Sequence, residues 1–246
     1  MGLFAKITRN ELRLFLREPL VAFFSLAFPT ILVVILGSIP EFREPSEALG
    51  GVTVISLYVG IALALGLAML GLQFMPTVLA SYRERGVLRR VAVTPVRPVT
   101  LLGAQLAATL VMALVSGILV LAVGKIAFDV NLPGQPVGFL IAYLLCGAGV
   151  FAVGLLVAAL APSGKAGNAI GTLLFFPSMF FAGLWTPREV LPAVLQRIGD
   201  FTPLGAGERA LHDAAVGQWP ALLPLAVLLA YVVVFGAAAA RLFRWE

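Results

Sequence analysis

Charged residues are scarce in this chain. Only 12% of its 246 residues are charged, whereas 61% are hydrophobic, and the mean hydropathy is +1.03. Soluble domains carry about 25% charged and about 45–50% apolar residues. The pI near 9.9 would suit a nucleic-acid-binding protein, but the basic residues lie between long apolar runs, which is the pattern that orients membrane proteins. The composition therefore indicates an integral membrane protein, and we expect no nucleic-acid partner.

Reactive side chains are equally scarce. The single cysteine, Cys146, lies inside an apolar run, so it has no intrachain disulfide partner and is expected to be a small buried hydrophobe. His212 is the only histidine, and the sequence shows no cluster of carboxylates. A metal site or a nucleophilic triad needs several such groups together. We therefore expect no metal site, no catalytic residue and no enzyme activity.

A nucleotide-binding motif is also missing. The run 147–152 matches the dinucleotide fingerprint loosely, but it lies within an apolar segment and follows no soluble strand. Gly164-Lys165 resembles part of a phosphate-binding loop, yet Ala159 and Ala166 stand where such a loop needs Gly and Ser or Thr. This chain is thus expected to bind no cofactor. If ATP drives it, a partner polypeptide binds the ATP and Mg²⁺.

Long apolar runs make up most of the sequence. A bilayer core about 30 Å thick needs roughly 20 helical residues, and lipid offers no partner for unpaired backbone groups. We predict an all-α integral membrane protein with six transmembrane helices in one domain, residues 1–246. The expected spans are about 20–40, 52–79, 100–124, 137–161, 168–186 and 220–240.

The distribution of basic residues predicts the topology. With the N-terminus inside, 12 of the 17 Lys and Arg residues fall in inside segments and five fall outside. Because Lys and Arg concentrate in cytoplasmic loops, both termini are predicted to be cytoplasmic. We expect a multi-pass protein of the cell inner (plasma) membrane.

Residues 1–18 are predicted to form an amphipathic helix that lies on the membrane. Four basic residues share one face and would meet anionic lipid headgroups: Lys6, Arg9, Arg13 and Arg17. Glu11 and Glu18 project from the apolar side, where an unpaired acid is costly. Either both reach the headgroup layer, or they contact a basic residue of the loop 81–98.

The long outer loop, 187–219, is predicted to form a helical hairpin. Thr186-Pro187-Arg188-Glu189 has the pattern of a capping box that starts a helix, and a second short helix is expected over 207–215. Just before the hairpin stand four large side chains: Met179, Phe180, Phe181 and Trp185. They line the transport pathway or a gate, or they pack against neighbouring helices and lipid.

The stretch SYRERGVLRRVAVTPVRP, residues 81–98, gathers five basic residues between two apolar runs. It is predicted to be a cytoplasmic loop with a short basic amphipathic helix that ends before Thr94-Pro95. One interpretation is that its arginines only fix the topology. The other is a coupling element that seats in a groove of a cytoplasmic partner.

Residues 84–95 resemble the coupling loop of the permeases of type-2 ABC exporters, the drug-exporter-like membrane subunits. Two further regions agree: Arg17-Glu18-Pro19-Leu20 with Phe28-Pro29 resembles the end of the interfacial helix and the first span, and 168–204 resembles the fifth span and its hairpin. Val87 departs from the family, which often has Thr there. The resemblance covers nearly the whole chain.

This resemblance implies the permease subunit of an ATP-driven exporter. It implies a dimer with a second permease subunit, identical or related, and two cytoplasmic ABC ATPase subunits. The coupling residues would be Arg83, Glu84, Arg85, Gly86, Val87, Leu88, Arg89 and Arg90. An amphiphilic drug, antibiotic or lipid-like substrate is expected. Two alternatives stay open: an ion-coupled secondary transporter or channel, although no intramembrane charge offers an ion site, and a membrane enzyme or scaffold.

Overall fold

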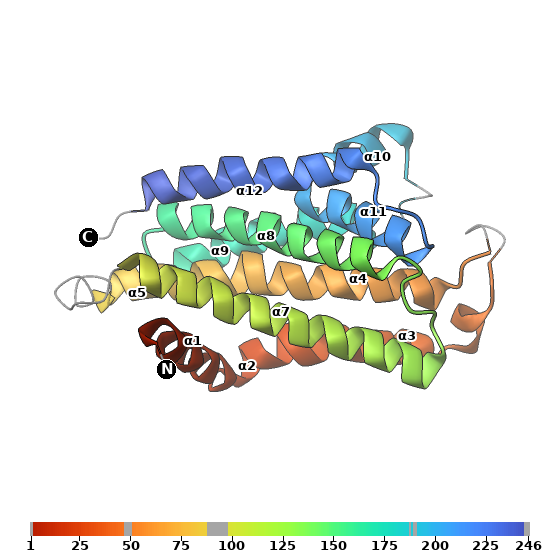
Figure 1. Ribbon diagram of the computed structural model, residues 1–246, viewed down its shortest axis with the longest axis horizontal. Coiled ribbons are helices and arrows are strands. Elements are labelled where there is room, and N and C mark those ends of the chain that lie inside the picture. The colour runs from red at the N-terminus through yellow and green to blue at the C-terminus, as the bar shows by residue number, and fades with distance from the viewer. Residues whose placement is uncertain (1, 47–50, 88–97, 187, 189–190, 244–246) are drawn as a thin grey trace.

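The computed structural model of the protein describes residues 2–46, 51–87, 98–186, 188 and 191–243. Within these ranges, long helices lie side by side in an elongated bundle (Figure 1). The helices are α1 (Leu3–Leu16), α2 (Pro19–Ala22), the π-helix η1 (Phe23–Ala27), α3 (Phe28–Gly37), the 3₁₀ turn η2 (Pro40–Arg43), α4 (Val54–Ala68), the π-helix η4 (Met69–Phe74), α5 (Met75–Glu84), α7 (Pro98–Phe128), α8 (Pro136–Leu160), α9 (Gly164–Phe181), α10 (Ala193–Asp200), α11 (Pro203–Ala215) and α12 (Leu222–Leu242).

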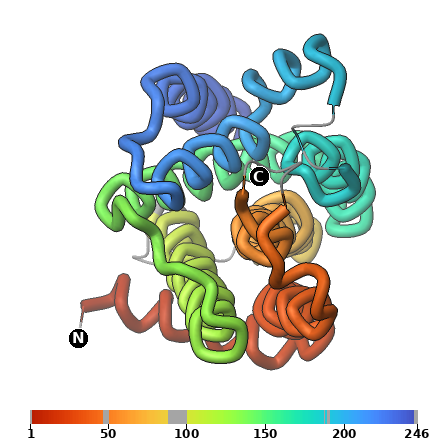
Figure 2. The backbone as a smooth tube through the Cα atoms, turned by 90° about the vertical axis from the view of Figure 1, so that its right-hand side faces the viewer, coloured from red at the N-terminus to blue at the C-terminus, as the bar shows by residue number. Residues whose placement is uncertain are grey.

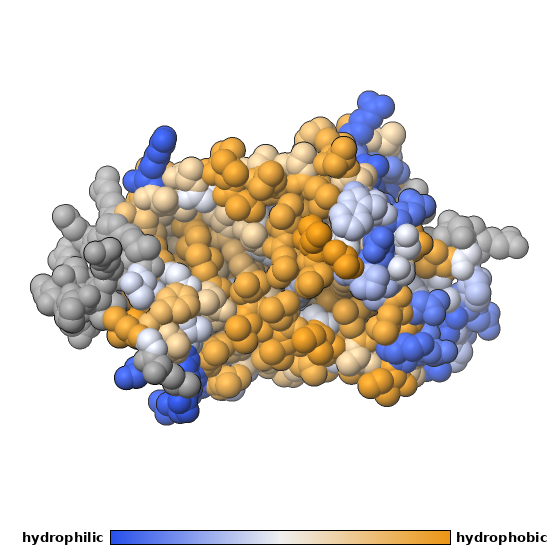
Figure 3. All heavy atoms as spheres, in the orientation of Figure 1, coloured by the Kyte–Doolittle hydropathy of each residue, from blue (hydrophilic) through white to orange (hydrophobic). Residues whose placement is uncertain are grey.

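Five helical stretches of the described chain are long and apolar enough to cross a membrane. They are Pro19–Gly37, Val54–Glu84, Thr100–Phe128, Pro136–Leu160 and Leu222–Leu242. The remaining expected span, 168–186, corresponds to α9, which is not among the five because Lys165, Asn168 and three glycines dilute its apolar content. Figure 3 shows hydrophobic side chains over the middle of one face, with hydrophilic ones toward both ends, as expected for a bundle in a bilayer.

The continuous stretch α4–η4–α5 forms the centre of the bundle. In its most apolar window 67% of the residues are buried, against 22% for the first span and 17% for the last. Figure 2 shows this stretch with other helices around it. The first and last spans instead expose large apolar side chains such as Leu20, Leu229 and Val233, which suits contact with lipid tails.

Glycines allow α9 to approach this central stretch closely. A Cβ atom at Gly171 would overlap the carbonyl oxygen of Leu72, and one at Gly167 would lie 2.8 Å from the carbonyl oxygen of Pro76. Small residues permit such backbone contacts between membrane helices, where apolar side chains gain little by leaving lipid. Gly167 and Gly171, four residues apart on one face of α9, thus let its backbone contact the central stretch.

Both π-helices directly precede a proline-containing turn. Pro29 and Pro76 have no N–H group, so the carbonyl groups of Ser25 and Leu72, four residues earlier, lack a helical donor. The hydroxyl of Ser116 on α7 donates to the Ser25 carbonyl oxygen at 3.0 Å, while the Leu72 carbonyl faces α9. Neighbouring helices thus accommodate the carbonyl groups that these prolines leave open.

The outer hairpin differs from its prediction at the start of the second helix. Before it, Arg188 lies in a 3₁₀ turn, and α10 begins at Ala193, directly after Pro192. Pro187 and Glu189 of the expected capping box lie outside the described residues. The second helix begins at Pro203, where the Thr202 hydroxyl accepts a hydrogen bond from the Gly205 N–H at 3.2 Å.

The close contact at Gly171 yields a stability prediction. Gly171→Ala should destabilise the protein by about 1–3 kcal/mol, since the added methyl forces α9 away from η4. Gly236→Ala is the matched control, because a Cβ there meets no atom within 4 Å. Thermal unfolding in detergent measures both, and equal midpoints for the two variants would contradict the packing described here.

Candidate functional site

Arg83, in the last turn of α5, binds the end of α8. Its Nη1 donates to the carbonyl oxygen of Ala159 at 2.9 Å, and its Nη2 donates to the carbonyl oxygen of Ala161. The last carbonyls of a helix have no partner within the helix, and the negative end of the helix dipole lies there. A guanidinium at this position therefore satisfies open acceptors and places its charge favourably.

Glu84, the next residue, binds the start of α9. Its Oε2 accepts a hydrogen bond from the N–H group of Gly164, the first residue of α9, at 2.9 Å. The Ser163 hydroxyl caps the same helix by accepting from the Ala166 N–H at 3.2 Å. We call Arg83 and Glu84 together the clasp, because the pair holds both sides of the turn between α8 and α9.

The clasp changes the prediction for the loop that follows it. Arg83 and Glu84 were expected in the short helix of this loop, but they lie in the last turn of α5 and bind the α8–α9 turn, with Glu84 itself exposed. The chain then turns at Gly86, whose φ of +65° is a conformation that favours glycine. Of the other predicted coupling residues, Arg85 and Val87 adjoin this turn. Leu88, Arg89 and Arg90 lie outside the described residues.

Glu11 on α1 binds the residue that precedes the clasp. Its side chain is buried, only 6% exposed, and its Oε2 accepts a hydrogen bond from the Tyr82 hydroxyl at 2.8 Å. Burial raises the pKa of the Glu11 carboxyl above its usual value, and the hydrogen bond from Tyr82 acts in the opposite direction. Of the two alternatives, a position in the headgroup layer does not describe the buried Glu11, whereas Glu18 is exposed. The partner shown, Tyr82, lies in the segment 81–98 of the second alternative but is a phenol.

The rest of α1 agrees with an interfacial helix. Lys6, Arg9, Arg13 and Arg17 are all exposed. On the inner side, the ring of Phe15 is buried and meets Phe74 edge to face, with the ring centroids 4.9 Å apart. This contact and the Glu11–Tyr82 hydrogen bond fasten α1 to the central stretch.

A groove of about 760 Å³ lies between the α1–η1 segment and the η4–α5 segment. Both π-helices contribute lining residues, as such turns often do at functional sites. Gln73, Thr77 and Ser81 are four residues apart and form a polar stripe along one wall, and Asn168 of α9 lies 3.5 Å from the Thr77 hydroxyl. Its apolar lining consists of Leu14, Phe15, Leu20, Val21, Phe24, Met69, Phe74 and Val78, and its charged lining of Glu11, Arg17, Glu18 and Arg85.

The family model described as ABC-2 type transporter matches residues 3–216, which include the clasp, the groove and the outer hairpin. The chain belongs to the ABC-2 type transporter family. Comparison with curated proteins finds no match. Membership confirms the resemblance found in the sequence and identifies a multi-pass membrane permease domain without ATPase activity. Permeases of this family typically pair with ABC ATPase subunits.

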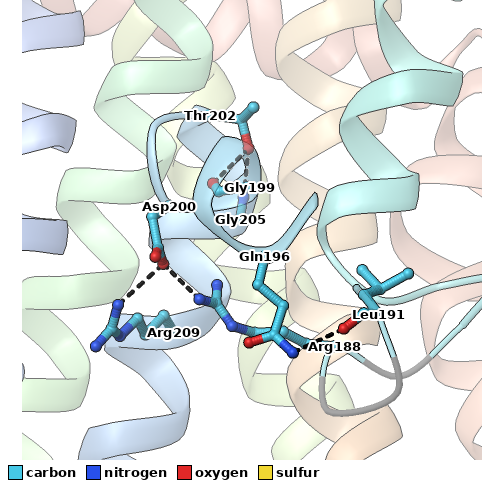
Figure 4. Close-up of polar contacts among 8 residues, drawn as sticks. All are labelled: Arg188, Leu191, Gln196, Gly199, Asp200, Thr202, Gly205 and Arg209. Atoms are coloured by element: carbon cyan, nitrogen blue, oxygen red, sulfur yellow. Dashed lines mark hydrogen bonds and ion pairs between the residues drawn. The ribbon is translucent and has the colours of Figure 1, made fainter. Parts of the chain in front are cut away.

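At the opposite end of the ABC-2 permease, Asp200 holds the hairpin together. Its Oδ1 accepts from Nη2 of Arg188 at 2.6 Å and from Nη1 of Arg209 on α11 at 3.0 Å (Figure 4). The side chains of Asp200 and Arg188 are only 13% and 18% exposed, so water screens this contact less than a surface ion pair. Arg209 thereby links α11 to the end of α10, and Arg188 links the segment before α10 to the same carboxylate.

The four predicted gate residues lie near this hairpin. Met179 is fully buried in the core, and Phe181 packs against Gly199 of α10. Phe180 is half-buried beside Phe181, and Trp185 is exposed. These positions fit packing for Met179 and Phe181, and a role in the pathway or gate stays a prediction.

Neither cysteine nor histidine builds a reactive centre in the permease as described. Cys146 is buried, as expected, with its Sγ 3.7 Å from the carbonyl oxygen of Pro203. His212 lies on α11 between two outer cavities, beside Glu208. Among the described residues, no group of three or more His, Cys, Asp or Glu side chains offers a metal site.

The role of Asp200 can be measured by local stability. Asp200→Asn should cut hydrogen-exchange protection of α10 about tenfold or more, because two half-buried arginines lose their counter-charge. Asp129→Asn, the control, breaks an ion pair with Lys125 in which Asp129 is 89% exposed, and should leave protection unchanged. Unaltered exchange in α10 of Asp200→Asn would contradict the proposed hold.

Proposed function

We propose that this chain is the transmembrane permease subunit of an ATP-driven exporter, coupled to two separate cytoplasmic ABC ATPase subunits that bind the ATP and Mg²⁺. Two permease subunits, identical or related, form the translocation pathway. The family match supports the transporter class, and the clasp is the observation that carries the coupling mechanism.

A six-span topology with both termini in the cytoplasm belongs to this proposal, with α9 as the additional span. Eighteen helical residues are about 27 Å long, close to the hydrocarbon thickness. α9 also exposes large apolar side chains, among them Leu173 and Phe176. In Figure 1, α1, the clasp end of α5 and the end of α12 lie at one end of the bundle, where the sequence concentrates its basic residues.

The clasp gives the coupling loop a mechanical connection. A force that an ATPase applies to residues 85–97 reaches the last turn of α5, and from there the guanidinium and carboxylate pass it to the turn between α8 and α9. Charge-assisted hydrogen bonds are short and directional, so they resist separation better than neutral contacts. The proposed movement therefore includes α9, whose Asn168 lines the groove.

The groove is the proposed entry site for substrate. Its wall combines apolar side chains with the neutral polar stripe of Gln73, Thr77 and Ser81. Ligand pockets typically enclose about 300–1,000 Å³ and are mostly apolar with a few polar groups. This lining supports an amphiphilic drug, antibiotic or lipid-like substrate.

Reconstitution tests the exporter proposal. The permease and its ATPase, together in lipid vesicles, should move a fluorescent amphiphile against its gradient only when ATP is present. A hydrolysis-deficient ATPase should abolish that movement, while an uncoupler of ion gradients should not. Uphill transport by the permease alone, or transport that collapses with the uncoupler, would favour an ion-driven carrier instead.

The clasp makes its own prediction in this assay. Arg83→Gln and Glu84→Gln should each lower transport per ATP hydrolysed about tenfold, because each loses one charged contact to the α8–α9 turn. ATPase binding, followed by co-purification, should persist. Arg241→Gln removes an exposed charge at the end of α12 and should behave like the parent. A full transport yield in both clasp variants would refute the mechanical role.

A further inference from the structure

Glu11 is the one charged residue that is buried within the part of the chain that the structure describes. Its hydrogen-bond donor, the Tyr82 hydroxyl, is neutral at physiological pH and carries no compensating charge. A buried carboxylate without a counter-charge is costly. Because Glu11 also lines the groove, a positively charged ligand there would place a counter-charge beside a carboxylate whose described hydrogen-bond donor is neutral.

The groove is shaped for an elongated molecule with one charged end. Met69 and Tyr82 both line it and stand thirteen residues apart, which is about 20 Å along a helix. Glu11 and Tyr82 lie at the clasp end, while Phe24, Met69 and Gln73 line the end nearer the membrane centre. A ligand with its head at Glu11 would therefore extend its apolar body along aromatic and aliphatic side chains.

The rim of the groove carries charges of both signs. Arg17 and Glu18 follow α1, and Arg85 ends α5. All three are exposed, so water and salt screen them. Water and salt screen the charge of the buried Glu11 carboxylate least. This negative charge therefore favours a positive charge in the interior of the groove.

We propose that the groove selects amphiphiles with a cationic centre and that the Glu11 carboxylate is the group that binds this centre. The inference rests on the proposed exporter function and narrows its substrate class to organic cations. Tyr82 positions the carboxylate through its hydroxyl, and the walls formed by Phe15, Phe24 and Phe74 accept the apolar body.

A pH dependence follows from the raised pKa of Glu11. The protonated carboxyl attracts no cation, so cation affinity should rise as the pH increases through that pKa and should be lowest below it. The other charged or titratable groups facing this site are Arg17, Glu18, Tyr82 and Arg85. α7, which also packs against α1, carries only Lys125, near its far end.

The test uses a pair of probes that differ mainly in the sign of their charge. Tetraphenylphosphonium is a cation, and tetraphenylborate is an anion of nearly the same shape. Equilibrium binding to the full chain in phosphatidylglycerol nanodiscs, whose lipid carries no ammonium group, is measured for both, with protein-free nanodiscs subtracted. We expect saturable binding of the cation alone, about tenfold weaker in Glu11→Gln and without the pH dependence of the parent.

Two further variants separate cation binding from a purely structural role. Glu41→Gln makes the same substitution at an exposed carboxylate at the opposite end of the bundle and should bind like the parent. Tyr82→Phe removes the hydrogen bond but keeps the carboxylate, so cation binding should persist. If Glu11 only fastens α1, Tyr82→Phe and Glu11→Gln should lose binding equally, and that result would overturn the proposal, as would unchanged binding in Glu11→Gln.

The source of the cation is distinguished by adding phosphatidylethanolamine, whose headgroup carries an ammonium group. Competition with the probe assigns the site to an amino lipid, and lack of competition assigns it to a non-lipid amphiphile.

The ATP-driven vesicle assay with a neutral amphiphile tests the exporter proposal separately from the preference for cations. Export of the neutral molecule without binding of the cation would reject only the charge preference, whereas absence of all ATP-dependent export would reject the exporter itself.

Discussion

The last turn of α5 holds the structure together at one end of the bundle. Successive residues on a helix point about 100° apart, so Tyr82, Arg83 and Glu84 face three directions. Each reaches a different element: Tyr82 meets Glu11 on α1, Arg83 the end of α8 and Glu84 the start of α9. The positions of the groove wall, of α9 and of the loop that follows α5 all depend on this turn.

Contacts to the backbone carbonyl groups explain how the bundle can contain π-helices and prolines and still be stable. In lipid, an open carbonyl has no water to bind, yet two prolines each remove a donor from the central and first spans. Ser116 compensates one of these carbonyls by a hydrogen bond, and α9 approaches the other through Gly171. The π-helices next to these prolines contribute to the lining of the groove, so the irregular backbone lies beside the proposed substrate site.

Hydrophobic runs were enough to predict the helical class and five of the spans, because length and apolarity alone determine which segments cross a bilayer. The basic face of α1 followed from helical spacing. Periodicity could not reveal the clasp or the partner of Glu11, since these contacts join residues 71 to 80 positions apart. Ser163-Gly164 has the local pattern of a helix N-terminus, where a carboxylate is favourable. The sequence alone does not show that Glu84 supplies this carboxylate. The second hairpin helix begins at Pro203 rather than near residue 207, because the Thr202 hydroxyl caps it there.

In the proposed mechanism, the same turn would connect the ligand in the groove with the ATPase. A cation on Glu11 would compete with Tyr82 for the carboxylate and so change how firmly α1 is held to α5. One residue further on, the clasp fixes the base of the loop that an ATPase would move. Tyr82 and Arg83 are adjacent in one helical turn. A displacement of Tyr82 would therefore also displace Arg83, and the reverse. Coupling between an occupied groove and the cytoplasmic loop therefore needs no long-range pathway through the bundle: it requires only that this single turn of α5 shift as a unit.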